Sequence, residues 1–142
     1  MIMSQALQAS GKIPVFGRGD DPINFVSAAD VAALAELAVT DPGPGQVVQL
    51  GGPDNLTLNQ LAAIVQETTG HRGTVRHIPR SALQAMACLT AAVRPALARQ
   101  ARAALAMDTL DMTFDPAPTR RSFPDLPETD IRMALKDLLQ DA

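Results

Sequence analysis

The chain has 142 residues, 46% of them hydrophobic, and a formal net charge of −3. A chain of this length and hydrophobic share fits one globular domain, which argues against wholesale disorder. The small negative net charge argues against a general polyanion binder. Four Phe are the only aromatic residues among Phe, Trp and Tyr, so aliphatic side chains and Met must build the core.

Residues 1–10 read as the end of a helix that Gly11 closes. A short extended stretch over 13–16, a turn rich in Gly and Asp, and an apolar strand over 23–26 follow. Ser27 is a candidate N-cap for the next helix, because Asp30 stands three residues later in the capping-box relation. This helix ends at the Asp-Pro-Gly-Pro-Gly run that closes at residue 45.

The middle of the chain gives stronger start and stop signals. A strand is expected over 47–50, and Thr57 with Gln60 forms a capping box for a helix that Gly70 ends. Residues 74–78 are a third strand candidate.

The last third of the chain is helical in pattern. The Ala-rich stretch over 81–107 contains Pro95, which predicts two helices or one strong kink. A proline-rich segment over 115–127 precedes a final helix that Thr129 or Asp130 caps. Cys88 lies in the apolar helical pattern, so we expect a buried structural thiol.

Strands that alternate with helices predict an α/β fold with a parallel sheet. About three short strands make a thin sheet, whereas parallel sheets are normally covered on both faces. We therefore expect a partial, Rossmann-like sheet edge from which a covering part is missing.

Several segments carry a resemblance to a known family. These are the strand and helix start INFVSAADVA (23–32) after its GRGDD turn, the unit VVQLGGPDNLTLNQLAAIVQETTG (47–70) and the tail SFPDLPETDIRMALKDLL (122–139). In order and spacing they resemble the C-terminal half of extended and atypical short-chain dehydrogenases/reductases of the NmrA-like group. The resemblance implies an NAD(P)-dependent oxidoreductase about twice this long, with residues 1–80 as the edge of its Rossmann-like domain and 81–142 as a helical substrate-side lobe.

The chain departs from that family where the chemistry is concentrated. The family's usual proton donor is a Tyr with a Lys four residues on; this chain has no Tyr, and its only lysines are Lys12 and Lys136. The turn Gly17-Arg-Gly19 runs into Asp20-Asp21-Pro22, which is a poor phosphate cradle. Ile23 stands where epimerase relatives often carry an Arg, which argues against a sugar-nucleotide substrate. We expect no catalytic and no cofactor-binding residue in this chain, and no NAD(P) bound to it alone.

Other chemistry is weakly supported. His71 and His77 lack the spacing and the companions of a metal site, so no metal ligand is expected. Scarce Lys and the lack of stacking aromatics argue against nucleic acid, and an Ala-rich stripe argues against a membrane surface. A lone cysteine, the absence of an apolar run of about 20 residues and the absence of a leader pattern make the cytoplasm the expected location.

Two hypotheses of function remain. The first is the C-terminal portion of an NAD(P)-dependent short-chain oxidoreductase, which supplies a wall of the substrate pocket and pairs with a missing N-terminal Rossmann half. The resemblance places that wall around two segments, formed by Phe16, Gly17 and Arg18 and by Arg76, His77 and Ile78. The alternative is a small non-catalytic binding or regulatory module that self-associates through exposed apolar faces or docks on a partner.

Overall fold

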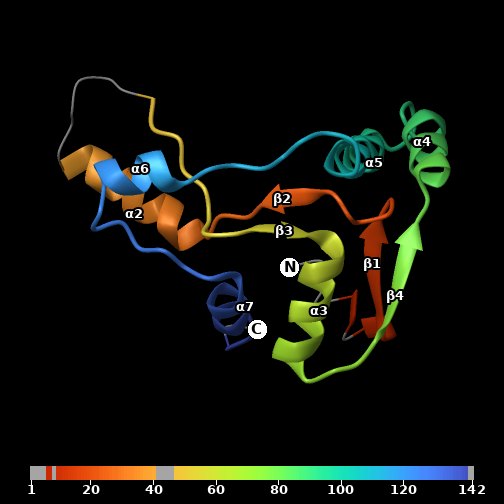
Figure 1. The fold of residues 1–142 in the computed structure, drawn as a ribbon. Coiled ribbons are helices and arrows are strands. Elements are labelled where there is room, and N and C mark those ends of the chain that lie inside the picture. Colours follow the sequence, from red (N-terminus) through yellow and green to blue (C-terminus); the bar gives the residue numbers. More distant parts are fainter. Residues whose placement is uncertain (1–5, 8, 41–46, 141–142) are drawn as a thin grey trace. The chain divides into compact units, whose positions relative to one another are not determined.

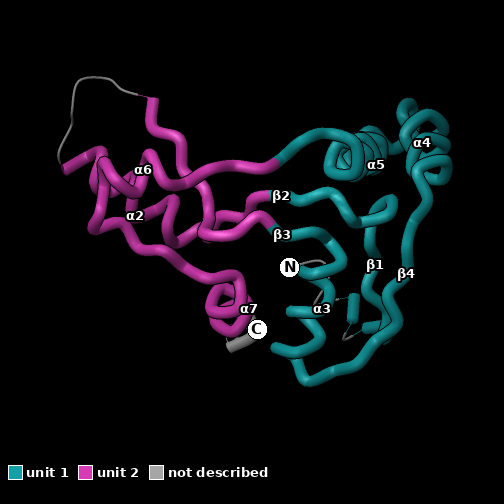
Figure 2. The backbone as a smooth tube through the Cα atoms, viewed as in Figure 1, with its two compact units in different colours: residues 1–23, 56–112 teal, residues 24–55, 113–142 magenta. Residues whose placement is uncertain are grey.

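The computed structural model describes residues 6–7, 9–40 and 47–140 of the chain, which form two compact units (Figures 1 and 2). Unit 1 comprises residues 1–23 and 56–112, and unit 2 comprises residues 24–55 and 113–142. Each unit is therefore built from two segments that are far apart in the sequence. The boundary predicted at residue 80 concerns the division of a longer relative and stays a prediction.

Unit 1 contains the parallel strand pair that the sequence predicts. β1 (Lys12–Phe16) and β4 (Thr74–Ile78) run parallel in the register that pairs Lys12 with Thr74 and Phe16 with Ile78. Ile13 and Val15 point to one face of β1 and are fully buried, and α3 (Leu58–Thr69) contacts this strand with its own buried apolar residues. The α/β fold class is thus confirmed.

The ends of α3 follow from its sequence. The Thr57 hydroxyl accepts from the Gln60 N–H, and the Gln60 side chain accepts from the Thr57 N–H, which completes the predicted capping box. Gly70 closes the helix with φ 67°, a conformation that a residue without Cβ adopts at little cost.

Two helices follow β4 in unit 1, as Pro95 predicts. α4 (Arg80–Leu89) and α5 (Pro95–Met107) pack against each other, and Pro95 begins the second helix, where its missing N–H costs nothing. α5 buries only its small residues Ala98, Ala101 and Ala104. Cys88 lies on the outer side of α4 and is exposed, so the prediction of a buried thiol is wrong.

Unit 2 contains α2 (Ala28–Thr40), α6 (Ala117–Ser122) and α7 (Ile131–Gln140). The chain passes between the units along β2 (Pro22–Asn24) and β3 (Asn55–Thr57), which pair in a second two-stranded sheet. The four strands of the described residues thus form two small sheets instead of one sheet with about three strands.

The strand expected over 47–50 does not form. Val47 is 92% exposed, and the Gln49 carbonyl accepts from the Thr119 hydroxyl, a side-chain donor, where a strand would offer a backbone N–H. The strand lies further along, at β3, where it pairs with β2. There the side-chain amide of Asn55 also exchanges two hydrogen bonds with the backbone of Phe114. An apolar run without a neighbouring strand has no ladder to join.

The role expected for Asp30 is also different. Ser27 caps α2 as predicted, since its hydroxyl accepts from the Ala29 N–H at 3.2 Å. Asp30 does not turn back to this cap: its carboxylate is 1% exposed and accepts from the N–H and the hydroxyl of Thr129. Asp130 then caps α7 through the Arg132 N–H, so Asp30 ties α2 to the loop that leads into the last helix.

Candidate functional site

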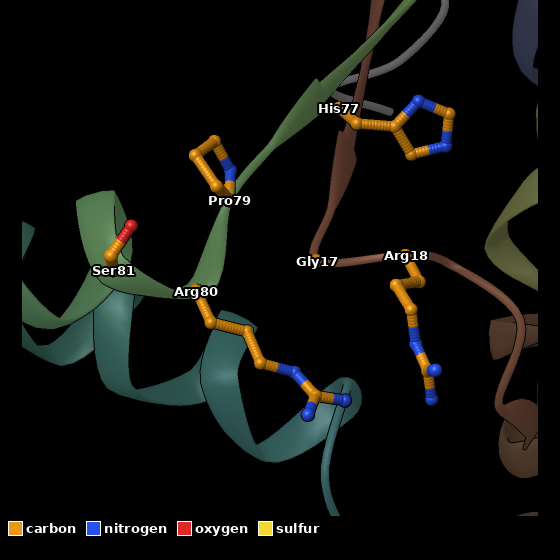
Figure 3. A pocket seen from close by; sticks show the side chains of 6 residues that line it. All are labelled: Gly17, Arg18, His77, Pro79, Arg80 and Ser81. Atoms are coloured by element: carbon orange, nitrogen blue, oxygen red, sulfur yellow. The ribbon is translucent and has the colours of Figure 1, made fainter.

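A pocket lies where the parallel strands β1 and β4 end. It has a volume of about 480 Å³, and Figure 3 shows the residues that line it, Gly17, Arg18, His77, Pro79, Arg80 and Ser81. The carboxyl ends of parallel strands are the usual place for ligands in open α/β sheets, because the loops there diverge and leave a crevice. All six residues belong to unit 1.

The turn after β1 is fixed by a buried carboxylate. Gly17 and Gly19 have φ 62° and 70°, and an added Cβ on Gly17 would overlap the carboxylate of Asp108. The Asp108 carboxylate is 1% exposed and accepts from the N–H groups of Arg18 at 3.0 Å and Gly19 at 3.4 Å. Asp108 thus holds the backbone of one pocket wall from behind.

Arg80 completes this arrangement from the start of α4. Its guanidinium donates to the carboxylate and to the backbone carbonyl of Asp108, and lies 3.9 Å from Asp21. Burial raises the pKa of Asp108, but the bonds from Arg80 and from the two N–H groups outweigh it, so this pKa lies below its ordinary value. The same hydrogen bond raises the pKa of Arg80.

His77 and Asn59 organise the opposite side of the turn. The Asn59 amide donates to the Arg18 carbonyl at 3.0 Å and to Asp20 at 2.9 Å, and its oxygen lies 3.1 Å from His77 Nε2. Since an amide oxygen only accepts, this contact makes Nε2 the protonated ring nitrogen.

A second pocket shares His77 and Pro79 with the first. It has a volume of about 440 Å³ and is lined by Ala6, Ser10, Lys12, Pro14, Arg76, His77, Ile78, Pro79 and Ala82. Lys12, Pro14, Arg76 and Ile78 lie on the face of the strand pair opposite to Ile13 and Val15. The two pockets therefore flank the end of β4.

The structure brings together most of the residues that the sequence proposes for the substrate wall. Gly17, Arg18 and His77 line the first pocket, and Arg76, His77 and Ile78 line the second, whereas Phe16 lines neither. The assignment of these residues to a substrate stays a prediction.

Sequence reasoning missed three residues of this site: Asn59, Arg80 and Asp108. Asp108 is about 90 residues from the N–H groups that it binds, and Asn59 is 41 residues from Arg18. Their sequence signal is weak, although a carboxylate at the end of an Ala-rich helix is unfavourable for the helix dipole and so needs another reason.

The glycine-containing turns do not fit a dinucleotide. The N–H groups of Arg18 and Gly19 already donate to Asp108, and the Gly52 N–H donates to Asn24 Oδ1 at 2.8 Å. Each turn leads into a short strand, and neither is followed by the helix N-terminus that a pyrophosphate requires. No group of three or more His, Cys, Asp or Glu in the described part of the chain is arranged to hold a metal ion. None of the helices described is both long and apolar enough to span a bilayer.

Known structures share this fold over nearly the whole chain. The NADPH-dependent quinone oxidoreductase of Escherichia coli in complex with NADPH has a TM-score of 0.73 and 22% identity, with 97% of this chain and 48% of that chain covered. The triphenylmethane reductase of Citrobacter sp. has a TM-score of 0.74 and 18% identity, with 98% and 49% covered. For a nucleoside-diphosphate-sugar epimerase of Staphylococcus aureus the values are 0.69 and 21%, with 98% and 47% covered.

No protein-family model matches the sequence, and no curated protein matches it. Identities of 17–22% establish a common fold and nothing finer. The chain spans about half the length of each of these structures, and so has the fold of one half of proteins that are described as NADPH-dependent reductases or as an epimerase.

Proposed function

We propose that this chain is the C-terminal, substrate-side half of an NAD(P)-dependent oxidoreductase of the short-chain dehydrogenase/reductase type, NmrA-like in its relationships. It supplies a sheet edge and one wall of the substrate pocket, while a separate N-terminal Rossmann half binds the nucleotide. The observation that carries this proposal is the pocket at the ends of β1 and β4, where the Asp108 carboxylate accepts from the N–H groups of the glycine turn.

This chain matches about half the length of the reductase structures. That match supports the assignment of the substrate-pocket wall to one half of the enzyme and of nucleotide binding to the other. With no Tyr in the sequence, the family's usual proton donor is absent from this half. The chain alone is therefore expected to have no oxidoreductase activity. Because the N–H groups of Arg18, Gly19 and Gly52 already have acceptors, it is also expected to bind neither NADPH nor NADH.

Calorimetry and thermal unfolding of the isolated chain test the first part of this proposal. At a concentration a hundred times its dissociation constant a nucleotide would add about 2.7 kcal/mol of stability, a clear rise in melting temperature. We expect no saturable heat and no shift with millimolar NADPH or NADH. A saturable site that survives changes in the pocket arginines would overturn the proposal.

A fusion tests the second part. The half of the E. coli quinone oxidoreductase that this chain does not span would be joined to residues 1–142, and NADPH oxidation would be followed with menadione and with a triphenylmethane dye. We expect reduction faster than by that half alone. A folded, monodisperse, NADPH-binding fusion without such a gain would contradict a substrate-side role.

The alternative, a non-catalytic module that self-associates, draws support from two side chains of the α4–α5 corner. Leu89 and Val93 are each 81% exposed. Sedimentation of the isolated chain separates the readings: a stable dimer that Leu89→Gln and Val93→Gln convert to a monomer favours the module.

A further inference from the structure

We propose that the pocket at the ends of β1 and β4 binds a small organic oxyanion, a carboxylate or a phosphate ester, with Arg18 as its main contact. This inference deepens the proposed function, because it takes the pocket as the substrate wall and names the class of substrate.

The residues that line the two pockets offer positive charge and hydrogen-bond donors without any acid. Arg18, Arg80 and Ser81 supply these groups in the first pocket, and Lys12 and Arg76 supply positive charge in the second, while no Asp or Glu lines either pocket. Unit 1 as a whole carries eight Lys and Arg against five Asp and Glu, a charge of +3, whereas unit 2 carries four against ten, a charge of −6. The pocket thus lies in the cationic unit of an acidic chain.

The carboxylates close to the pocket are already engaged. Asp108 is buried under Arg80 and the turn, Asp20 accepts from Asn59, and Asp21 lies 3.9 Å from the Arg80 guanidinium. The Arg18 guanidinium, in contrast, has no hydrogen-bond or ion-pair partner among the described residues. In Figure 3 it extends to the same side of Gly17 as the Arg80 guanidinium.

The start of α4 adds to this arrangement. Pro79 is its N-cap residue and has no side-chain acceptor for the first N–H groups, which belong to Arg80 and Ser81. The Pro79 ring, which lines both pockets, offers an apolar surface to the body of a ligand. An oxyanion on a small apolar body matches these donors and this surface.

The test is a titration of the chain with benzoate, phenyl phosphate and uncharged benzamide at constant ionic strength, followed by NMR and calorimetry. We expect both anions to bind at least tenfold more tightly than benzamide, with the larger affinity identifying the preferred head group. Arg18→Gln is expected to weaken the better anion about tenfold, since it removes a charge-assisted contact.

Arg102→Gln is the matched control, because it removes the same charge from an exposed position on α5 that lines neither pocket. Equal losses in the two variants, or equal binding of benzamide and the anions, would overturn the inference. Unchanged NMR spectra of Arg18→Gln outside the turn show that the fold is kept.

Titration with NADPH shows whether the inference or the proposed function fails, because NADPH carries phosphates that could enter the oxyanion pocket. Binding of NADPH that Arg18→Gln abolishes and phenyl phosphate displaces belongs to the oxyanion pocket and supports the inference. NADPH binding that persists in Arg18→Gln marks a nucleotide site in this chain, which overturns the proposed function and leaves the anion titration to decide the inference. Absence of anion binding together with absence of NADPH binding overturns the inference alone.

Discussion

Asp108 is the residue on which the geometry of the candidate site depends most. It joins three parts of unit 1, the turn after β1, the start of α4 and the end of α5, through one buried carboxylate. Buried carboxylates are stable only when their oxygens are paired. Removing the charge therefore affects the pocket wall and the stability of unit 1 together.

Asp108→Asn is expected to destabilise the chain on the order of 1–3 kcal/mol, because Arg80 is left facing a neutral amide. Since the pKa of Asp108 lies below its ordinary value, its stabilising effect is fully present above about pH 5. The effect is lost as the pH falls below about 4 through the lowered pKa. Urea unfolding at several pH values measures this: the gap between the two proteins should close on acidification, and a constant gap would exclude an ionised Asp108.

Gly17 is required by conformation and by space. Its φ of 62° costs about 1–2 kcal/mol for a residue with Cβ, and the Asp108 carboxylate occupies the position of that Cβ. Gly70 has φ 67° and no atom within 4 Å of such a Cβ, so it is the matched control. Gly17→Ala should destabilise the chain more than Gly70→Ala by roughly 1–3 kcal/mol. Equal melting temperatures would show that the turn tolerates a displaced Asp108.

At the scale of elements, the helix ends that depend only on neighbouring residues were predicted correctly from the sequence. The capping box at Thr57, the left-handed Gly70 and the break before Pro95 each depend on residues within one turn, and all three form. The prediction of a strand over 47–50 is wrong, because a strand forms only beside a pairing strand and the residues of one segment do not show whether such a neighbour exists. The capping role expected for Asp30 fails for the same reason, because a distant partner decides it. The Asp30 carboxylate accepts from Thr129, which is 99 residues away in the sequence.

Thr57→Ala tests how much the capping box contributes to α3. It removes the hydroxyl that accepts from the Gln60 N–H, while the backbone N–H of residue 57 still donates to the Gln60 side chain, so we expect a loss of about 1 kcal/mol in the free energy of unfolding. Thr68→Ala in the same helix removes only a bond to the Ile64 carbonyl and improves helix propensity. Urea unfolding should therefore find Thr68→Ala near neutral, and an equal loss in both variants would argue against the cap.

At the scale of the whole molecule, the sequence predicts the fold class and the position of the pocket better than the organisation into units. The strands β1 and β4 and the residues at their ends follow from apolar runs and turns near residues 17 and 79. The two units could not be predicted, because each combines an early and a late segment. Contacts such as Asn55 with Phe114, 59 residues apart, have no periodicity that reveals them.

The division into units makes a prediction about cooperativity. Thr129→Val removes the hydroxyl bond to Asp30 and so weakens the tie between α2 and the loop before α7, both within unit 2. Local opening follows cooperative units, so hydrogen exchange should accelerate together in α2 and α7 while α3 and β1 keep their protection. Thr109→Val is the control, because its hydroxyl bonds only the Leu105 carbonyl in unit 1. If Thr129→Val instead accelerated exchange equally in α3, the two units would unfold as one, and a loss of contacts in unit 2 would reach the pocket through global unfolding.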